Sequence, residues 1–350
     1  MRRVTVSASQ TYDILIGTGF IDRVGKYISQ ICPNCTAAII SDSNVWPLFG
    51  QAVTESLQAA KVNAVHFVFP AGEASKNIET YFEILNFLAE NKITRSDVIV
   101  ALGGGVVGDI SGFCAATYLR GIRYVQIPTS LLAMVDSSVG GKTAIDLPAG
   151  KNLVGAFKQP CLVLCDVSTL DTLPTDVFLD GCAEVIKYGV LYDEDLLTYL
   201  YQTGKDFDRE AVVTKCVSCK ANVVAKDEFD TGERQKLNLG HTIGHGVEAA
   251  SVYEISHGKA VAIGIAIVAA AAVKYNLCTQ HVLDTIIAVL KKFSLPTACD
   301  FTAQQLLGAA LSDKKRSGSM INLIVPREIG MCEILPFPIG ELESFIEAGL

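Results

Sequence analysis

The 350-residue sequence predicts two domains. Residues 1–170 should form an α/β dinucleotide-binding domain with a parallel sheet, and residues 171–350 a mostly α-helical domain that binds metal and substrate. In the first half, short β-branched or aromatic runs alternate with helical patterns, and a glycine-rich turn follows one of those runs. After about Leu170, long helical periodicity replaces the alternation. Half of the residues are hydrophobic and 19% are charged, a composition typical of a globular enzyme.

The individual elements follow from hydrophobic periodicity. Four apolar runs predict strands and three stretches between them predict helices: strands at 37–40, 65–69, 98–102 and 124–127, and helices at 48–60, 78–91 and 106–119. This alternation favours parallel strands that are covered by helices on both faces. In the second half, residues 260–273 are too few to span a bilayer, which needs about 20, so they predict a buried helix. Residues 321–325 predict a strand.

A glycine-rich turn follows the third of these predicted strands, at residues 98–102. The segment Gly103–Gly108 fits G-x-G-x-x-G and precedes a helical pattern, where free N–H groups and the helix dipole can hold a pyrophosphate. The acidic residue that the Rossmann pattern places about 20 residues later is missing, so a different dinucleotide fold is expected. A second glycine pair precedes Lys142, but Asp136 stands where a Walker A motif needs glycine. A nucleoside triphosphatase is therefore disfavoured, and Lys142 remains a candidate for contacting an anion.

Three of the five histidines lie close together in the second half. His241 and His245 are four residues apart and project from one helix face, and His257 follows after a loop. This spacing suits a metal such as zinc, for which catalytic sites supply three protein ligands. Glu184 is the candidate carboxylate, because an acid among apolar neighbours needs a partner. An ion pair between Glu184 and Lys187 on the same helix is the alternative reading.

Charge and cysteine content exclude several protein classes. The formal net charge of −8 disfavours nucleic-acid binding, and the start of the chain lacks the apolar core of a signal peptide. We therefore expect a cytoplasmic protein without a membrane partner, whose eleven cysteines are reduced. The pairs Cys32/Cys35 and Cys216/Cys219 have C-x-x-C spacing but read as core thiols. Scattered cations each read alone as surface charge: Arg120, Lys142, Lys151, Lys187, Lys220, Arg234 and Lys314.

Several longer motifs occur together and in order. They are LGGGVVGD at 102–109, TSLLAMVDSSVGGKT at 129–143, GKNLVG at 150–155, AEVIKYG at 183–189 and NLGHTIGH at 238–245. On these motifs the sequence resembles the 3-dehydroquinate synthases of the sugar-phosphate cyclase superfamily, from about residue 41 to residue 325.

The resemblance implies roles for named residues. Glu184, His241 and His257 would be the ligands of zinc or cobalt, and His245 would be a catalytic residue facing the substrate. NAD would be bound by Asp42, Asn44, Glu73, Lys76, Gly104, Gly105, Val106, Asp109, Thr129, Ser130, Lys151, Thr169, Leu170, Asp171 and Thr172. The other catalytic residues would be Lys142, Asn152, Lys187, Lys220, Arg234 and Asn238, and the substrate would also contact Arg120, Asp136 and Lys314.

The implied reaction converts 3-deoxy-D-arabino-heptulosonate 7-phosphate, a phosphorylated sugar acid, to 3-dehydroquinate and phosphate in the shikimate pathway. NAD would accept a hydride and return it, so no net redox change is expected, and a homodimer is implied. The sequence departs from the family at Met134, Thr175–Val177 and Lys259. Alternative readings are a 2-deoxy-scyllo-inosose synthase or valiolone-type cyclase, a glycerol-dehydrogenase-like polyol dehydrogenase, and a nucleotide-binding paralogue without activity.

Overall fold

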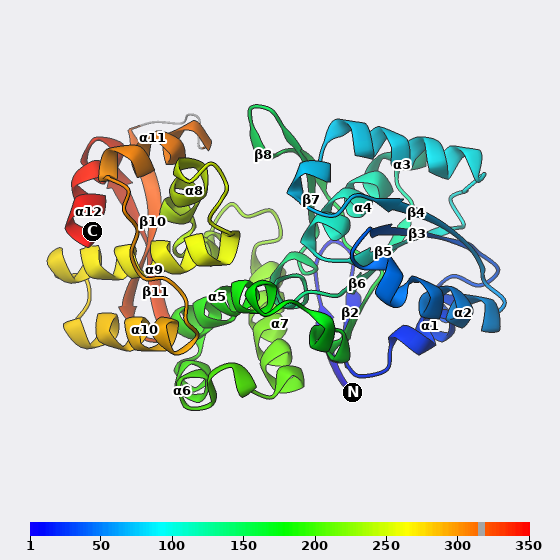
Figure 1. Cartoon of the computed structure of the whole chain (residues 1–350), viewed down its shortest axis with the longest axis horizontal. Coiled ribbons are helices and arrows are strands. Elements are labelled where there is room, and N and C mark those ends of the chain that lie inside the picture. The colour runs from blue at the N-terminus through cyan, green and yellow to red at the C-terminus, as the bar shows by residue number, and fades with distance from the viewer. Residues whose placement is uncertain (314–318) are drawn as a thin grey trace. The chain divides into compact units, whose positions relative to one another are not determined.

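The computed structural model describes residues 1–313 and 319–350, which divide into two compact units (Figure 1). Unit 1 comprises Met1–Leu173 and Lys220–Phe229, and unit 2 comprises Pro174–Cys219 and Asp230–Leu350. The sequence places one boundary at residues 170/171 and does not foresee the return of Lys220–Phe229 to unit 1. That return lies largely within one continuous helix, α7 (Arg209–Lys226), so no turn residue or change of composition marks it.

Unit 1 is built on a seven-stranded sheet in the order β1-β2-β9-β6-β5-β3-β4. The strands are β1 (Arg2–Val6), β2 (Tyr12–Gly17), β3 (Thr36–Asp42), β4 (Asn63–Phe69), β5 (Val98–Gly103), β6 (Arg123–Pro128) and β9 (Leu162–Asp166). Only the edge pair β1–β2 is antiparallel among these neighbours. The order β4-β3-β5-β6-β9 is that of a flavodoxin-like sheet rather than of the Rossmann fold, as the missing acidic residue predicts.

Helices bury both faces of this sheet (Figure 1). They are α1 (Val24–Ile31), α2 (Gln51–Ala59), α3 (Ile78–Glu90) and α4 (Gly105–Thr117). Val98, Val100 and Leu102 of β5 pack with residues of α1 and α2, whereas Ile99 and Ala101 pack with residues of α3 and α4. Alternate residues of a strand point to opposite faces, so a strand with two covered faces reads as one apolar run. This is why the sequence predicts β5 correctly.

The predicted elements of unit 1 are confirmed within a few residues. The four predicted strands are β3 to β6, and the three predicted helices are α2, preceded by a π turn at Trp46–Gly50, α3 and α4. Strands β1, β2 and β9 and the antiparallel hairpin of β7 (Lys142–Leu147) and β8 (Gly150–Phe157) were not predicted. Most residues of β1 and β8 are exposed or half-buried, so they lack the apolar runs that identified the other strands.

Unit 2 is mostly helical, as predicted. Besides the first part of α7 it contains α5 (Thr175–Tyr192), α6 (Glu194–Thr203), α8 (His241–Ala250), α9 (His257–Lys274), α10 (Gln280–Lys292), α11 (Ala303–Asp313), α12 (Leu342–Gly349) and a hairpin of β10 (Met320–Glu328) and β11 (Met331–Pro338). The predicted strand at 321–325 lies within β10. Helix α9 is long and apolar enough to cross a membrane, but 72% of its apolar window is buried in the structure. The prediction of a buried helix is thus confirmed.

Candidate functional site

The carboxyl ends of parallel strands in unit 1 lie level at one edge of the sheet. Gly103 at the end of β5 pairs with Pro128 at the end of β6, and Thr129 N–H donates to the carbonyl of Gly103 at 3.0 Å. Asp42 ends the neighbouring strand β3, and Gly104 follows β5. The chain order reverses between β3 and β5, and ligands of open α/β sheets bind outside the carboxyl ends at such a point. The structure therefore gathers these predicted nucleotide contacts at one edge.

The glycine turn connects β5 to the first turn of α4. Gly104 is the N-cap residue, so the helix begins with N–H groups that lack carbonyl partners within the helix. A Cβ atom at Gly108 would lie 2.7 Å from Oε1 of Gln126 on β6. Glycine at this position lets α4 pack closely on the sheet and aims its N-terminus at the carboxyl edge. This geometry suits a phosphate group.

A buried lysine links the segment before α3 to α4 and to the β7–β8 hairpin. Nζ of Lys76 lies 2.7 Å from Oδ2 of Asp109 and donates to Oδ1 of Asn152 at 2.6 Å. Asn152 has a φ of 57°, and its N–H donates to Asp146 at 2.7 Å. Burial raises the pKa of Asp109, and despite burial the charges of Asp109 and Glu73 raise the pKa of Lys76. This network connects Lys76 and Asp109, which are expected to bind NAD, with Asn152, which is expected to be catalytic.

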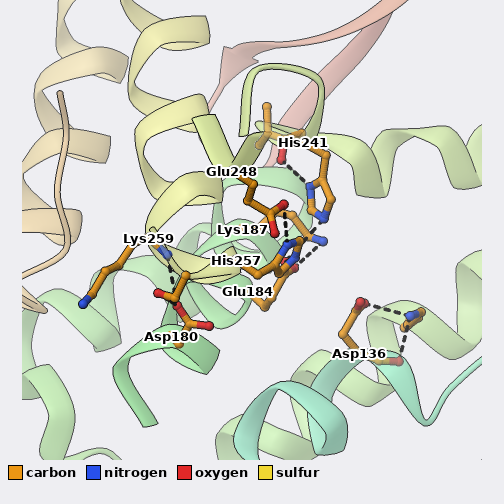
Figure 2. Close-up of polar contacts among 11 residues, drawn as sticks. Asp136, Asp180, Glu184, Lys187, His241, Glu248, His257 and Lys259 are labelled. Atoms are coloured by element: carbon orange, nitrogen blue, oxygen red, sulfur yellow. Dashed lines mark hydrogen bonds and ion pairs between the residues drawn. The ribbon is translucent and has the colours of Figure 1, made fainter. Parts of the chain in front are cut away.

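A second ion pair in unit 1 joins Lys220 to Asp136 (Figure 2). Nζ of Lys220 donates to the carbonyl oxygen and to Oδ1 of Asp136, both at 2.7 Å. Lys220 is buried and belongs to the part of α7 that returns to unit 1. The contact brings together a predicted catalytic lysine and a predicted substrate-binding carboxylate.

Three predicted metal ligands converge in unit 2 (Figure 2). Oε1 of Glu184 lies 3.4 Å from Nε2 of His241 and 3.3 Å from Nε2 of His257. Glu184 is fully buried, and Lys187 forms an ion pair with its other oxygen, Oε2. Glu184 thus forms the ion pair with Lys187 that the alternative reading predicts, and it also faces the two histidines.

The local fold explains how the histidines meet. His241 begins α8, and His257 begins α9. Between them the chain reverses in a turn in which Ser251 Oγ donates to the carbonyl of Glu248 and accepts the N–H of Ile255. The turn brings the start of α9 back beside α8, so the two imidazole rings lie 5.3 Å apart between centroids. His245, one turn further along α8, lies 6.3 Å from the ring of His257.

A carboxylate of α5 holds the first turn of α9. Oδ1 of Asp180 accepts hydrogen bonds from Oγ of Ser256, the N-cap residue, and from the N–H of Lys259 (Figure 2). A Cβ atom at Gly258 would lie only 2.0 Å from the carbonyl oxygen of Asp180, so the two helices meet backbone to backbone. Glu184 lies one helical turn after Asp180 on α5. The contact between Asp180 and the first turn of α9 therefore places Glu184 opposite His257.

The Nδ1 atoms of His241 and His257 also have partners. Nδ1 of His241 lies 3.1 Å from the carbonyl oxygen of Leu239, and Nδ1 of His257 lies 3.3 Å from Oε2 of Glu248. Both Nε2 atoms are thereby left to face Glu184. Two imidazole nitrogens and one carboxylate oxygen form a donor set that fits zinc or cobalt. Each imidazole ring is held in place by the partner of its Nδ1 atom.

The electrostatics of the cluster without metal distinguish its histidines. Burial and the charge of Lys187 lower the pKa of His241 to about 3. Burial acts in the same direction on His257, but hydrogen bonds with Glu184 and Glu248 outweigh it and raise the pKa of His257 to about 10. These opposite shifts favour a proton on His257 over one on His241.

The other predicted site residues are placed as follows. Arg234 is buried and lies with Asn238 in a 3-10 segment (Glu233–Asn238) directly before α8. Thr169 to Thr172 follow β9 in a 3-10 segment, with Thr169 and Leu170 buried. Exposed or half-buried positions hold Asn44, Glu73, Gly105, Val106, Arg120, Ser130, Lys142 and Lys151. Lys314 lies outside the described residues.

Sequence reasoning missed two residues of this site, Glu248 and Asp180. Glu248 follows His241 by seven residues and His245 by three, a spacing that puts all three on one face of α8. That spacing was the available signal. Asp180 offered none beyond its position one turn before Glu184.

Comparison with known proteins identifies the family. Residues 66–180 match the family model described as 3-dehydroquinate synthase N-terminal, and residues 181–316 match the one described as 3-dehydroquinate synthase C-terminal. The chain is 41% identical to the 3-dehydroquinate synthase of Streptococcus suis (strain 05ZYH33), an alignment that covers 99% of each chain. The chain belongs to the 3-dehydroquinate synthase family. The family member of Enterococcus faecalis (strain OG1RF) is 40% identical over 99% of this chain and 98% of the relative. The predicted family is confirmed, and with it an enzyme of the lyase type that forms 3-dehydroquinate.

Solved structures confirm the fold. A 2-deoxy-scyllo-inosose synthase complexed with carbaglucose-6-phosphate, NAD+ and Co2+ has a TM-score of 0.90 and 24% identity, with full coverage of both chains. The 2-epi-5-epi-valiolone synthase of Streptomyces hygroscopicus with NAD+ and Zn2+ has a TM-score of 0.89 and 25% identity over 99% of each chain. An NADH-dependent butanol dehydrogenase of Thermotoga maritima is more distant, with a TM-score of 0.71.

Proposed function

We propose that the chain converts 3-deoxy-D-arabino-heptulosonate 7-phosphate to 3-dehydroquinate and phosphate with one zinc or cobalt ion and NAD. The single observation that carries the proposal is the convergence of Nε2 of His241, Nε2 of His257 and Oε1 of Glu184 in unit 2. Two cyclases of similar fold were crystallised with NAD+ together with Co2+ or Zn2+, which supports the choice of cofactors.

We propose that NAD binds at the carboxyl edge of the sheet in unit 1. The turn from Gly104 to Val106 would hold the pyrophosphate through N–H groups of the first turn of α4. The remaining contacts would come from the strand ends and the segments after them: Asp42, Asn44, Glu73, Lys76, Asp109, Thr129, Ser130, Lys151, Thr169, Leu170, Asp171 and Thr172. In the structure Lys76 and Asp109 already bind each other, so they would act together.

The two cofactors would supply complementary chemistry: the metal acidifies a substrate hydroxyl and NAD accepts and returns a hydride. Glu184 and Lys187 would together add no net charge beside the metal, because their opposite charges form a buried ion pair. His245 stands beside the ligands and is half-buried, so its imidazole can carry a proton to or from the substrate.

Cations would bind the phosphate and carboxylate of the substrate. Lys142, Lys220 and Arg234 would stabilise negative charge as it develops on the departing phosphate. Asn152 and Asn238 would donate amide hydrogen bonds to oxygens of the substrate, and Arg120, Asp136 and Lys314 would complete the binding set. The ion pair of Lys220 with Asp136 supports this, because it fixes the lysine amine before the substrate arrives.

A phosphate-release assay with the heptulosonate phosphate, NAD and added Zn2+ or Co2+ tests the proposal. We expect phosphate and 3-dehydroquinate in equal amounts and no accumulation of NADH. NADH accumulating with a polyol substrate would instead show a dehydrogenase. Cyclisation of other phosphorylated sugars without formation of dehydroquinate would show a different cyclase.

We also propose that the enzyme is a cytoplasmic homodimer, as its resemblance to the family implies. Light scattering of the purified protein measures the assembly, and the expected mass is twice that of the chain.

A further inference from the structure

The imidazole of His257 is held at both of its nitrogens. Nε2 lies 3.3 Å from Oε1 of Glu184, on the metal side, and Nδ1 lies 3.3 Å from Oε2 of Glu248 on the other side (Figure 2). An imidazole ring can turn about its bond to Cβ, and in its neutral form only one nitrogen carries a hydrogen. A ligand histidine thus needs a partner that fixes both its rotation and its tautomer.

The position and burial of Glu248 suit it to be that partner. It lies on the same face of α8 as His241 and His245, and it is only 4% exposed. Its main chain is also fixed, because its carbonyl oxygen accepts the hydroxyl of Ser251 at 2.9 Å and the N–H of Tyr253 at 2.7 Å. Burying a carboxylate costs free energy unless the carboxylate has a hydrogen-bonding partner. The contact of buried Glu248 with His257 is therefore stronger evidence of a specific role than a contact made by an exposed carboxylate.

We propose that Glu248 is a positioning residue of the metal centre. Its Oε2 accepts a hydrogen bond from Nδ1–H of His257, which leaves the lone pair of Nε2 available to a metal, and its negative charge makes the imidazole a stronger electron donor. The proposal rests on the metal centre proposed above and adds a fourth residue that does not itself touch the metal. The carbonyl of Leu239 plays the matching part for His241, but without a full charge.

A different arrangement of the same atoms must be distinguished. Ligand atoms of His245, Glu248 and His257 also lie within 4.8 Å of one another. Glu248 could then be a metal ligand, with Nδ1 of His257 bound to a second ion. The geometry favours the positioning role, because the Nε2 atoms of both His241 and His257 already face the buried carboxylate of Glu184. The number of ions bound decides between the two arrangements.

The experiment measures cobalt binding by three variants and the wild-type protein. Glu248→Gln keeps the shape and a hydrogen-bond acceptor but removes the charge, whereas Glu248→Leu removes both and leaves an apolar side chain that should be compatible with folding. Glu254→Gln is the matched control, because it removes a carboxylate that is exposed in the turn between α8 and α9. The readouts are the dissociation constant from competition with a chromophoric chelator, the number of ions bound, and the visible absorption spectrum of bound Co2+. Thermal unfolding of the metal-free proteins checks that each variant is folded.

We expect one ion per chain in the wild-type protein and in every variant. Cobalt affinity should fall about 10-fold in Glu248→Gln and about 100-fold in Glu248→Leu, within the range known for residues behind a metal ligand. The cobalt spectrum should shift in both, because a ligand field responds to the donor strength of His257, and Glu254→Gln should match the wild type. A folded Glu248→Leu variant that keeps the cobalt affinity and spectrum of the wild type would overturn this inference but leave the proposed metal centre standing. Two ions in the wild type and one in Glu248→Gln would overturn it as well, by making Glu248 a ligand. A wild-type protein that binds no cobalt would contradict the proposed metal centre itself.

Discussion

Oδ1 of Asp180 accepts a 2.5 Å hydrogen bond from Oγ of Ser256, and this contact ties together the helices that carry two proposed metal ligands. Asp180 lies one helical turn before Glu184 on α5, and Ser256 directly precedes His257 on α9. The same carboxylate oxygen accepts the N–H of Lys259, so it also satisfies a free donor in the first turn of α9. Besides the direct contact of His257 with Glu184, a contact that neither residue makes therefore helps to set their relative position.

Replacing Asp180 by alanine should loosen this coupling. We expect the free energy of unfolding to fall by about 1 kcal/mol, because a helix cap is lost, and cobalt affinity to fall several-fold. Asp180→Asn keeps an acceptor oxygen and should retain most of both quantities. Urea unfolding and chelator competition measure them, and an alanine variant indistinguishable from wild type would show that the contact does not position His257.

Gly258 allows the close approach of α9 to α5. A Cβ atom there would lie 2.0 Å from the carbonyl oxygen of Asp180, and a backbone atom cannot move aside as a flexible side chain can. We expect Gly258→Ala to lower the free energy of unfolding by about 1–3 kcal/mol. Gly308→Ala is the control, because among the described residues no atom beyond its own stretch of helix lies within 4 Å of a Cβ there, and it should raise stability by up to about 1 kcal/mol. Equal effects in the two variants, measured by urea unfolding, would refute the packing argument.

Asp97 should make the stability of unit 1 depend on pH. Its carboxylate accepts the N–H of Thr36 and both the N–H and the hydroxyl of Thr94, all within 2.7 Å. Burial favours the neutral acid, but these hydrogen bonds outweigh it and lower the pKa of Asp97 in the folded state. Its contribution is thus complete above the unfolded pKa of about 4 and is lost as pH falls through the lower folded value.

Asp97→Asn measures that contribution. We expect the variant to be less stable than wild type by about 2 kcal/mol at pH 7, with the difference shrinking as the pH falls below about 4. Denaturant unfolding at several pH values gives the two curves. Parallel curves at all pH values would mean that the charge of Asp97 is not what stabilises the fold.

The elements that the sequence predicts correctly are those whose residues follow a single clear pattern of hydrophobicity or spacing. Strand β5 is buried on both faces and reads as an apolar run, and His241 with His245 shows helical spacing of metal-binding residues. By contrast, β8 is largely exposed, and the return of Lys220 to unit 1 depends on tertiary packing that no local pattern encodes. Glu248 and Asp180 were missed because acidic residues in helices are usually solvated. The spacing of Glu248 from the histidines was a signal, but only the fold shows that each carboxylate meets a partner on α9. The assignment of Lys220 came from the resemblance to the family and not from its charge.

The central claim is that Glu184, His241 and His257 hold the metal while His245 serves the substrate, and the metal content of two variants tests it most directly. His241→Ala and His245→Ala remove similar imidazoles one turn apart on α8, so each is a control for the other. After loading with zinc and removal of free ion, we predict that His245→Ala retains one zinc per chain but turns over slowly, whereas His241→Ala has lost both zinc and activity. One tightly bound zinc per chain in folded His241→Ala would contradict the account.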